Sequence, residues 1–387
     1  MSEIKVNSIK GVAASTAALT INNTDGTCTA NLTNRTNKNL IINGAMQVAQ
    51  RGTSFTASGS YPVDRFDVQQ VGTDEAPTMA QVDISVGTTP YTSGFRKAIK
   101  ITNGNQTSGA GAGDYIYIRQ KIEAQNVANS GWNYTSASSF VNLSFWIKSS
   151  VAQTFYGYLE TSDGTAQLYS FSTGALSADT WTKVTKKIPG GSNITINNDN
   201  GIGLSLQIVA FIGTTYTTSG NTLEQWANAG GFADIVPDNT STWYTTNDAT
   251  LEITGVQLEV GSVATDFEHR SFAQELALCE RYCQTIVKGQ QYFGTCMLYT
   301  SSTHTSAFLW KRTMRTTPSI VANSGGDYYI TYSNNGQSTY SSLSGSLSLA
   351  NENGGGVYST GGTGTQGHAG TMAGANASTL VLLSAEL

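Results

Sequence analysis

Aromatic side chains in polar surroundings are the residues of this sequence best suited to bind a ligand. Sugars place their apolar faces against exposed aromatic rings, which gain from the same desolvation as other aromatic contacts. Trp146 is an example, because it falls on the polar side of the alternating segment 140–148, FVNLSFWIK. The glycan-binding candidates are Trp146, Trp243, Tyr244, Tyr328, Tyr329 and Tyr332. Packing between sheets or between subunits is the alternative for each of them.

Residues for nucleophilic or acid–base catalysis are scarce. The chain has three histidines, His269, His304 and His368, and no Gly-x-Ser-x-Gly elbow. Asp64 and Asp67 flank Arg65 and Phe66, but residues three apart on a strand point to opposite faces. We therefore expect no enzymatic activity.

Neither a cofactor nor a metal site is predicted. The glycine-rich segment 104–113 lacks the Gly-Lys-Ser/Thr of a phosphate-binding loop. One alternative is structural calcium, of the kind that jelly-roll binding modules often hold, with backbone carbonyl oxygens completing the site. Its carboxylates would be Asp64, Glu123 and Glu259, although no EF-hand-type spacing supports it.

The four cysteines match neither a disulfide framework nor a zinc ligand set. They are Cys28, Cys279, Cys283 and Cys296. Cys279 and Cys283 lie one helical turn apart, and we expect both to act as small buried hydrophobic residues.

Composition excludes several classes of protein. The 387 residues carry 21 Lys and Arg against 26 Asp and Glu, a net charge of −5, and only 12% are charged, compared with about 25% in an ordinary soluble protein. An acidic chain with no basic run is not expected to bind nucleic acid. It has no apolar run of about 18 residues, so membrane insertion is not expected. The first residues lack a signal-peptide apolar core, which predicts synthesis in a cytoplasm.

The hydrophobic pattern predicts an all-β protein with two sandwich domains. In residues 140–148, Val141, Leu143, Phe145 and Ile147 share one face, which is typical of a half-buried strand. Strands recur across residues 39–270, and a jelly-roll β-sandwich is the natural interpretation. Strands resume over 289–387, predicting a second, C-terminal β-sandwich, with a glycine-rich loop at 353–370.

Two further segments differ from these domains. Residues 1–38 have too few apolar positions for a core of their own, so we interpret them as an extended anchor or intertwined stem. Over 271–288 the apolar spacing becomes 4, 3, 4, 3, which predicts a linker helix. Its seam comprises Phe272, Leu276, Cys279, Cys283 and Ile286. The helix either rests on a neighbouring domain or aligns three chains in a short bundle.

Several segments, in this order, resemble the β-sandwich domains of phage tail fibres and related virion proteins. The closest is 251–285, which contains TGVQLEVG, FEHR and ELALCERYC, with Asp266 and Cys283 in place of the family's commoner Pro and Tyr. The other segments are 39–52 (NLIINGAMQVAQRG), 61–66 (YPVDRF), 119–123 (RQKIE), 144–150, 181–188 and the final SAEL. The start, MSEIKVNSI, is similar to the attachment ends of some marine and cyanobacterial phage fibres.

The resemblance implies a homotrimeric, receptor-binding tail fibre of podophage or cyanophage type. Residues 1–38 would attach to a tail adaptor or nozzle, or to another virion protein. A carbohydrate-binding-module-like jelly roll would follow, and the fibre would bind host-surface polysaccharide or lipopolysaccharide. Such a protein would be made in the host cytoplasm and would reside in the virion. A head fibre or capsid-decorating protein built from the same modules is one alternative, and a glycan depolymerase or esterase tailspike is another.

Overall fold

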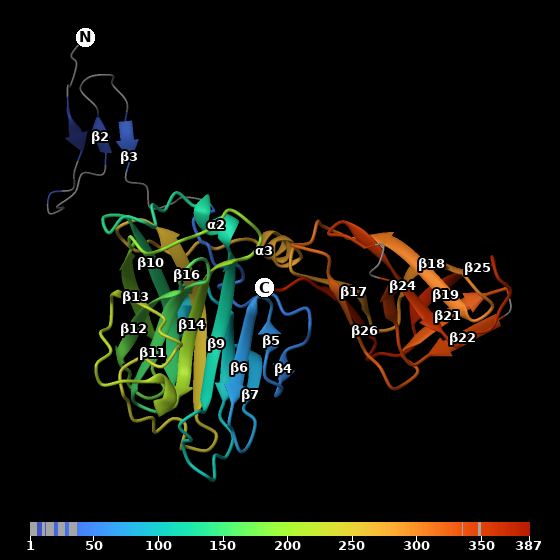
Figure 1. The fold of residues 1–387 in the computed structure, drawn as a ribbon, viewed down its shortest axis with the longest axis horizontal. Helices are drawn as coiled ribbons and strands as arrows, with labels where there is room; N and C mark the ends of the chain where they lie inside the picture. The colour runs from blue at the N-terminus through green and yellow to red at the C-terminus, as the bar shows by residue number, and fades with distance from the viewer. Residues whose placement is uncertain are drawn as a thin grey trace.

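A computed structural model describes residues 6–9, 12, 19–21, 28–30, 37–334, 336–346 and 350–387 of the chain. The protein is all-β, as predicted, with two separate β domains and three short helices. Figure 1 shows the large sandwich, the C-terminal domain and α3 between them. Among the described residues, no helix is long and apolar enough to cross a membrane.

The large sandwich consists of two antiparallel sheets. The six-stranded sheet has the order β13 (Thr182–Pro189), β10 (Phe140–Ser149), β16 (Thr250–Val260), β8 (Lys97–Thr102), β7 (Thr78–Asp83) and β4 (Ser54–Phe55). The seven-stranded sheet has the order β15 (Trp226–Asn228), β12 (Gln167–Ala175), β11 (Thr154–Thr161), β14 (Ile202–Ile212), β9 (Tyr115–Glu123), β6 (Phe66–Val71) and β5 (Ser60–Val63). The helices α1 (Thr89–Thr92) and α2 (Ala124–Ala128) and a 3-10 turn, Thr214–Tyr216, lie in its connections.

On β10, the face that alternation in residues 140–148 predicted to be buried lies in the core. Val141, Leu143, Phe145 and Ile147 are all fully buried between the sheets. The opposite side of β10 is also covered in part, because Asn142 and Ser144 are buried. Segment 261–270 returns beside this side, where the Gln257 side chain accepts from the Glu268 amide and donates to the Asp266 carbonyl oxygen.

The C-terminal domain also pairs two antiparallel sheets. Its three-stranded sheet has the order β17 (Cys283–Lys288), β26 (Leu380–Ser384) and β20 (Ser319–Ala322). Its seven-stranded sheet has the order β22 (Gly336–Tyr340), β21 (Tyr329–Ser333), β25 (Ala369–Gly374), β18 (Tyr292–Leu298), β19 (Thr303–Leu309), β24 (Gly354–Thr360) and β23 (Ser344–Ser346).

The glycine-rich segment 353–370 is therefore not one long loop as expected. Residues 354–360 form β24, which pairs with β19 along seven residues. Glycine lowers strand propensity only modestly, and tertiary packing overrides it here. Val357 on β24 is fully buried in the core of this domain.

The prediction of a helix over 271–288 is wrong for the second half of this segment. Helix α3 spans Phe272–Cys279 and begins with a capping box between Ser271 and Gln274. Cys283 and Ile286 lie instead on β17, because residues 283–288 pair with β26. The five seam residues thus do not form one helical stripe, and Phe272 is exposed.

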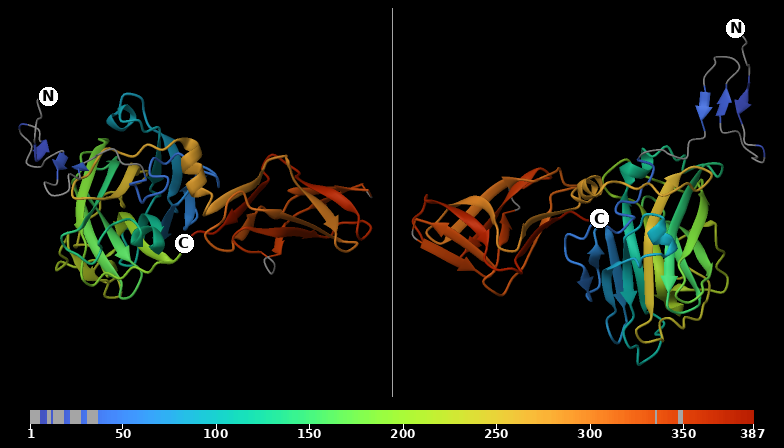
Figure 2. Two further views of the ribbon diagram at one scale, coloured as in Figure 1. Left: turned by 90° about the horizontal axis from the view of Figure 1, so that it is seen from above. Right: turned by 180° about the vertical axis from the view of Figure 1, so that it is seen from behind.

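Helix α3 rests on the large sandwich, which was the first of the two predicted roles. Glu275 on α3 is buried, accepts a hydrogen bond from the Asn43 amide and lies 3.5 Å from Arg270. Figure 2 shows α3 at the junction of the two β domains.

The N-terminal segment contains three short strands that pair with one another. They are β1 (Ser8–Ile9), β2 (Leu19–Ile21) and β3 (Cys28–Ala30), in that order within one antiparallel sheet. The remaining positions of 1–38, apart from the few described residues, lie outside the described part of the chain. The anchoring role of the segment stays a prediction.

Phe145→Ala is expected to test the core of the large sandwich. The ring is fully buried and lies 6.3 Å from the ring of Phe171 on the facing sheet. Its removal leaves a cavity, so the free energy of unfolding should fall by about 3–5 kcal/mol in guanidinium denaturation. Val86→Ala, at an exposed position, should change it little. Equal losses for the two variants would contradict the assigned core.

Candidate functional site

Most of the motifs that resemble phage fibres meet at the junction of the two β domains. We call this cluster the interdomain joint. It comprises Gln50, Arg51, Asp64, Arg65, Glu123, Arg281, Tyr282 and Glu386. These residues come from positions more than 300 apart in the chain. Asp64, Arg65, Glu123 and Tyr282 are buried, and the other four are half-buried. The joint is therefore a product of the tertiary fold.

Arg65 lies at the centre of the interdomain joint. It occupies the tight turn between β5 and β6 with a positive φ of 73°. Its guanidinium carbon lies 3.5 Å from the centroid of the Tyr282 ring. One guanidinium nitrogen pairs with Glu386, and the other donates to the Lys121 carbonyl oxygen at 2.6 Å. A buried guanidinium needs such partners, because desolvation penalises its charge. Arg65 thus ties the large sandwich to both ends of the C-terminal domain.

Glu123 forms the second contact of the joint. Its carboxylate accepts two hydrogen bonds from Arg281, at 2.6 and 2.8 Å, and a third from the Tyr282 hydroxyl. Burial raises the pKa of Glu123, but these hydrogen bonds outweigh it and hold the pKa below its ordinary value. The end of β9 is therefore clamped to the segment that connects α3 with β17.

Gln50 and Arg51 complete the joint. Gln50 donates from its amide and its side chain to the Asp64 carboxylate, at 2.9 and 2.6 Å, and also to the Cys283 carbonyl oxygen at 2.6 Å. Arg51 donates to Glu386 at 2.9 Å. Burial raises the pKa of Asp64, while Arg51 and the bonds from Gln50 oppose that rise.

These contacts contradict the calcium site considered from the sequence. Asp64 and Glu123 already have arginine and hydrogen-bond partners in the joint. Glu259 lies apart, where it accepts from Thr265 and lies 3.7 Å from Lys38. No group of metal-binding side chains occurs among the described residues.

Three of the six predicted aromatic candidates are buried, and their assignment as exposed glycan ligands is wrong. Trp243 and Tyr244 belong to the sandwich core, where Tyr244 stacks on Phe211 at 3.9 Å. The polar stretch around them closes the end of the sandwich and turns both rings inward. Tyr329 is buried in the C-terminal domain and donates to the Asn323 carbonyl oxygen at 2.8 Å.

The other three candidates remain at the surface to different degrees. Tyr328 is half-buried, whereas Tyr332 is exposed with its ring centroid 6.0 Å from that of Tyr292. Trp146 is half-buried and lines a hollow of about 340 Å³ on the outer side of the six-stranded sheet. Phe95 and Lys183 also line this hollow.

A larger set of side chains of the kinds that bind sugars, aromatic and polar, lies on the outer face of the seven-stranded sheet of the large sandwich. We call it the tyrosine face. It comprises Asp67, Gln69, Tyr115, Tyr117, Arg119, Tyr156, Glu160 and Gln207. Register places them in rows, because Asp67 faces Arg119 and Arg119 faces Gln207 on neighbouring strands. Figure 1 shows these strands, β6, β9, β14 and β11, side by side.

The tyrosine face joins half-buried rings to a hydrogen-bonded polar row. Tyr115 and Tyr117 stack with centroids 5.3 Å apart. Arg119 donates twice to Asp67, at 2.8 and 3.2 Å. Burial raises the pKa of Tyr117 to about 12, so its hydroxyl stays protonated at neutral pH and can donate a hydrogen bond. The face presents rings beside donors and acceptors, the combination that a polyhydroxylated ligand requires.

Gln207 has one polar atom that no residue satisfies. Its amide nitrogen donates to Glu160 at 2.9 Å, but its Oε1 has no hydrogen-bond partner although Gln207 is 2% exposed. A buried polar atom without a partner costs free energy. Burial raises the pKa of Glu160, opposed by the bond from Gln207 and by the charge of Arg119.

The sequence analysis missed the tyrosine face because it weighed single aromatic residues. The signal was present in two strands, YIYIR at 115–119 and YGYLE at 156–160, where polar and aromatic residues alternate with core residues. Only the strand order shows that the two segments lie on one face, since β14 separates them.

Comparisons with known proteins are limited to solved structures, since neither a family model nor a curated protein matches the sequence. The enzymatically active domain of tailspike protein 4 of bacteriophage CBA120 is 11% identical, over 58% of this chain and 21% of that one, with a TM-score of 0.30. A putative sugar-binding protein from Bacteroides thetaiotaomicron is 13% identical, over 58% and 100%, with a TM-score of 0.32. The N-terminal cellulose-binding domain of Cellulomonas fimi β-1,4-glucanase C is 10% identical, over 56% and 99%, with a TM-score of 0.27. The chain thus spans about a fifth of the tailspike structure.

Glu123→Gln is expected to weaken the interdomain joint. Removing the charge leaves Arg281 without its partner, which should lower the free energy of unfolding on the order of 3 kcal/mol at neutral pH. The pKa of Glu123 is depressed when folded, so its contribution is complete above the ordinary pKa of 4.5 and is lost as the pH falls through the depressed value. The stability difference between wild type and variant should therefore shrink in acid.

Thermal unfolding of both proteins between pH 3 and pH 8 measures this difference. Glu224→Gln is the matched control, since Glu224 pairs with Lys186 on the exposed surface. A stability difference that stays constant down to the lowest pH would refute the proposed role of the Glu123 carboxylate.

Proposed function

We propose that this chain is a structural virion protein, a homotrimeric phage tail fibre that binds host-surface glycans without cleaving them. The tyrosine face is the observation that carries the proposal. Its rings can stack on sugars, and its amide, guanidinium and carboxylate groups can bind hydroxyl groups.

Carboxylate spacing supports binding rather than hydrolysis at this face. Glycoside hydrolases hold their two carboxyl groups about 5–10 Å apart. Asp67 and Glu160 lie on β6 and β11, three strand spacings apart in the sheet. At about 4.8 Å per spacing, their strands are separated by roughly 14 Å. Each carboxylate is also engaged by a neighbouring side chain, Arg119 or Gln207.

The interdomain joint supports a role as a fibre. Its buried ion pairs and hydrogen bonds connect two β domains in one chain, so that a binding face on either domain keeps its orientation. Weak binding at single sites gains strength when several linked copies bind one surface. A trimer anchored to the particle through residues 1–38 would supply those copies.

Tyr117→Ala is expected to weaken glycan binding by about fivefold, since one stacking ring is worth on the order of 1 kcal/mol. Binding of the full-length protein to purified host capsular polysaccharide and lipopolysaccharide, measured by calorimetry, provides the test. Tyr91→Ala is the control, because Tyr91 is also half-buried but lies outside the tyrosine face against Arg96. Equal affinities for wild type and Tyr117→Ala would overturn the assigned face.

The same incubations show whether the bound glycan is cleaved. We expect binding with no oligosaccharide or acetate released. Release of either product would replace the adhesin with a depolymerase or an esterase.

Deletion of residues 1–38 should abolish incorporation into particles and leave glycan binding intact. The reason is that the tyrosine face contains no residue of this segment, whose short strands pair with one another. Immunodetection of the chain in purified virions measures incorporation. Normal incorporation of the deletion variant would place the anchor elsewhere in the chain.

A further inference from the structure

Among the described residues, the outer face of the seven-stranded sheet in the C-terminal domain carries no charged side chain. Strand register puts alternate residues of β18, β19, β24, β25 and β21 on this side, and all of them are Gly, Ala, Thr, Tyr, Met, Leu or Ile. We call it the neutral face. Four large side chains on it are exposed although they are largely apolar. They are Tyr292 (67% exposed), Met297 (49%), Leu309 (84%) and Tyr332 (40%).

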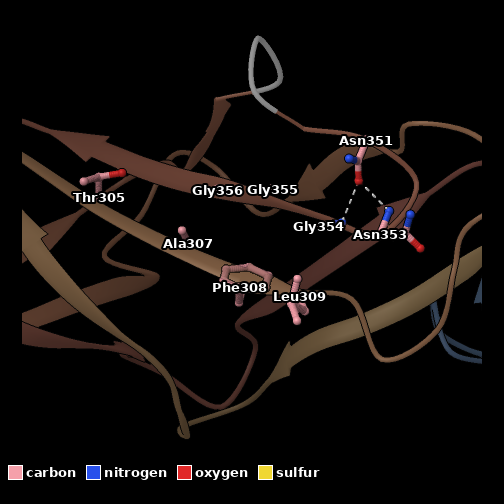
Figure 3. Close-up of a pocket in the computed structure, with 9 residues that line it drawn as sticks. All are labelled: Thr305, Ala307, Phe308, Leu309, Asn351, Asn353, Gly354, Gly355 and Gly356. Carbon is pink, nitrogen blue, oxygen red and sulfur yellow. Dashed lines mark hydrogen bonds between the residues drawn. The ribbon is translucent and has the colours of Figure 1, made fainter.

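A protruding side chain and a hollow lie next to each other on the neutral face. Leu309 projects at the end of β19, and a hollow of about 570 Å³ beside it is lined by Thr305, Ala307 and the glycines of β24 (Figure 3). The hollow exists because Gly354 and Gly356 bring no side chains to this side of the sheet. It has room for a leucine side chain from outside the molecule.

We propose that the neutral face is the surface through which copies of this chain pack against one another. The inference deepens the proposed function and rests on its homotrimer, since it names the interface of that assembly. In a closed ring, each subunit must supply both halves of the contact. The neutral face of each chain carries both halves, so Leu309 of one copy can enter the hollow of the next.

The chemistry of the face favours a second copy over other occupants. Subunit interfaces are depleted of charge at their centre and enriched in Tyr and Met. Copies that each carry a net charge of −5 repel one another least where they meet through uncharged surfaces. A glycan would require free, convergent polar side chains. Two asparagines also line the hollow, but both are engaged within the chain. Asn351 accepts from the Asn353 and Gly354 amides, and the Asn353 side chain accepts from Thr313 and donates to Glu352.

Light scattering coupled to size exclusion tests the proposal on the full-length chain. The wild type should elute at about 123 kDa, three times the 40.9 kDa of one chain. Leu309→Asp removes the projection and introduces a charge, and Ala307→Arg fills the hollow, so both should elute as monomers. Val86→Asp is the matched control, because Val86 is as exposed as Leu309 but lies in the large sandwich.

Cysteine labelling gives a second readout that does not depend on a disruptive variant. The thiol of Leu309→Cys should react slowly with a maleimide in the assembled protein, whereas that of Val86→Cys should react quickly. The native Cys279, Cys283 and Cys296 are buried, and Cys28 is replaced by serine in both variants, so the background is low. Rapid labelling at both positions would overturn the proposal.

A wild-type monomer, or a Leu309→Asp variant that remains a trimer, would likewise overturn it. A measurement of glycan binding distinguishes failure of the proposed interface from failure of the proposed glycan-binding function. The tyrosine face belongs to one chain, so monomeric Leu309→Asp should still bind a short oligosaccharide with wild-type affinity while losing avidity for polysaccharide.

Discussion

The buried Arg65 guanidinium and its partners are the contact on which the rest of the structure depends. Arg65 belongs to the large sandwich, Tyr282 to the segment that enters the C-terminal domain, and Glu386 to the segment that ends it. A single cation thus joins both ends of the second domain to the first. Removing one partner of a buried ion pair is far more costly than losing a surface pair, because the remaining charge stays desolvated. The two domains are therefore held by groups that tolerate little substitution.

The joint also explains the position of the tyrosine face. Lys121 continues the row that contains Tyr115, Tyr117 and Arg119 on β9, and its side chain reaches the carbonyl oxygen of the C-terminal Leu387. The same strand therefore carries ligand-type residues at one end and joint residues at the other. A rigid strand between them keeps the tyrosine face in a fixed relation to the C-terminal domain, where the neutral face lies. Under the two proposals, glycan recognition and assembly would lie on different domains of one connected body.

The sequence predicted individual strands well where alternation was clear. The faces of 140–148 and the return of strands over 289–387 are confirmed, because a buried face demands one residue type at every second position. Prediction failed where local preference and tertiary pairing disagreed. Residues up to Ile286 have helical spacing, but residues 283–288 form β17 and pair with β26. Residues 354–360 are rich in glycine, but they form β24 and pair with β19.

For the candidate sites too, the sequence determined some features and the tertiary structure decided others. Composition and alternation determined by themselves that the chain is all-β, low in charge and contains many aromatic residues. They did not determine which aromatic residues are exposed, and Trp243 and Tyr244 proved to be core residues. Exposure depends on which segment covers a residue, and those segments are far apart in the chain. The tyrosine face, the joint and the neutral face all come from strand order and register. Only the tertiary structure decided these, because many neighbouring strands in these sheets, such as β9 and β14 or β18 and β25, are far apart in sequence.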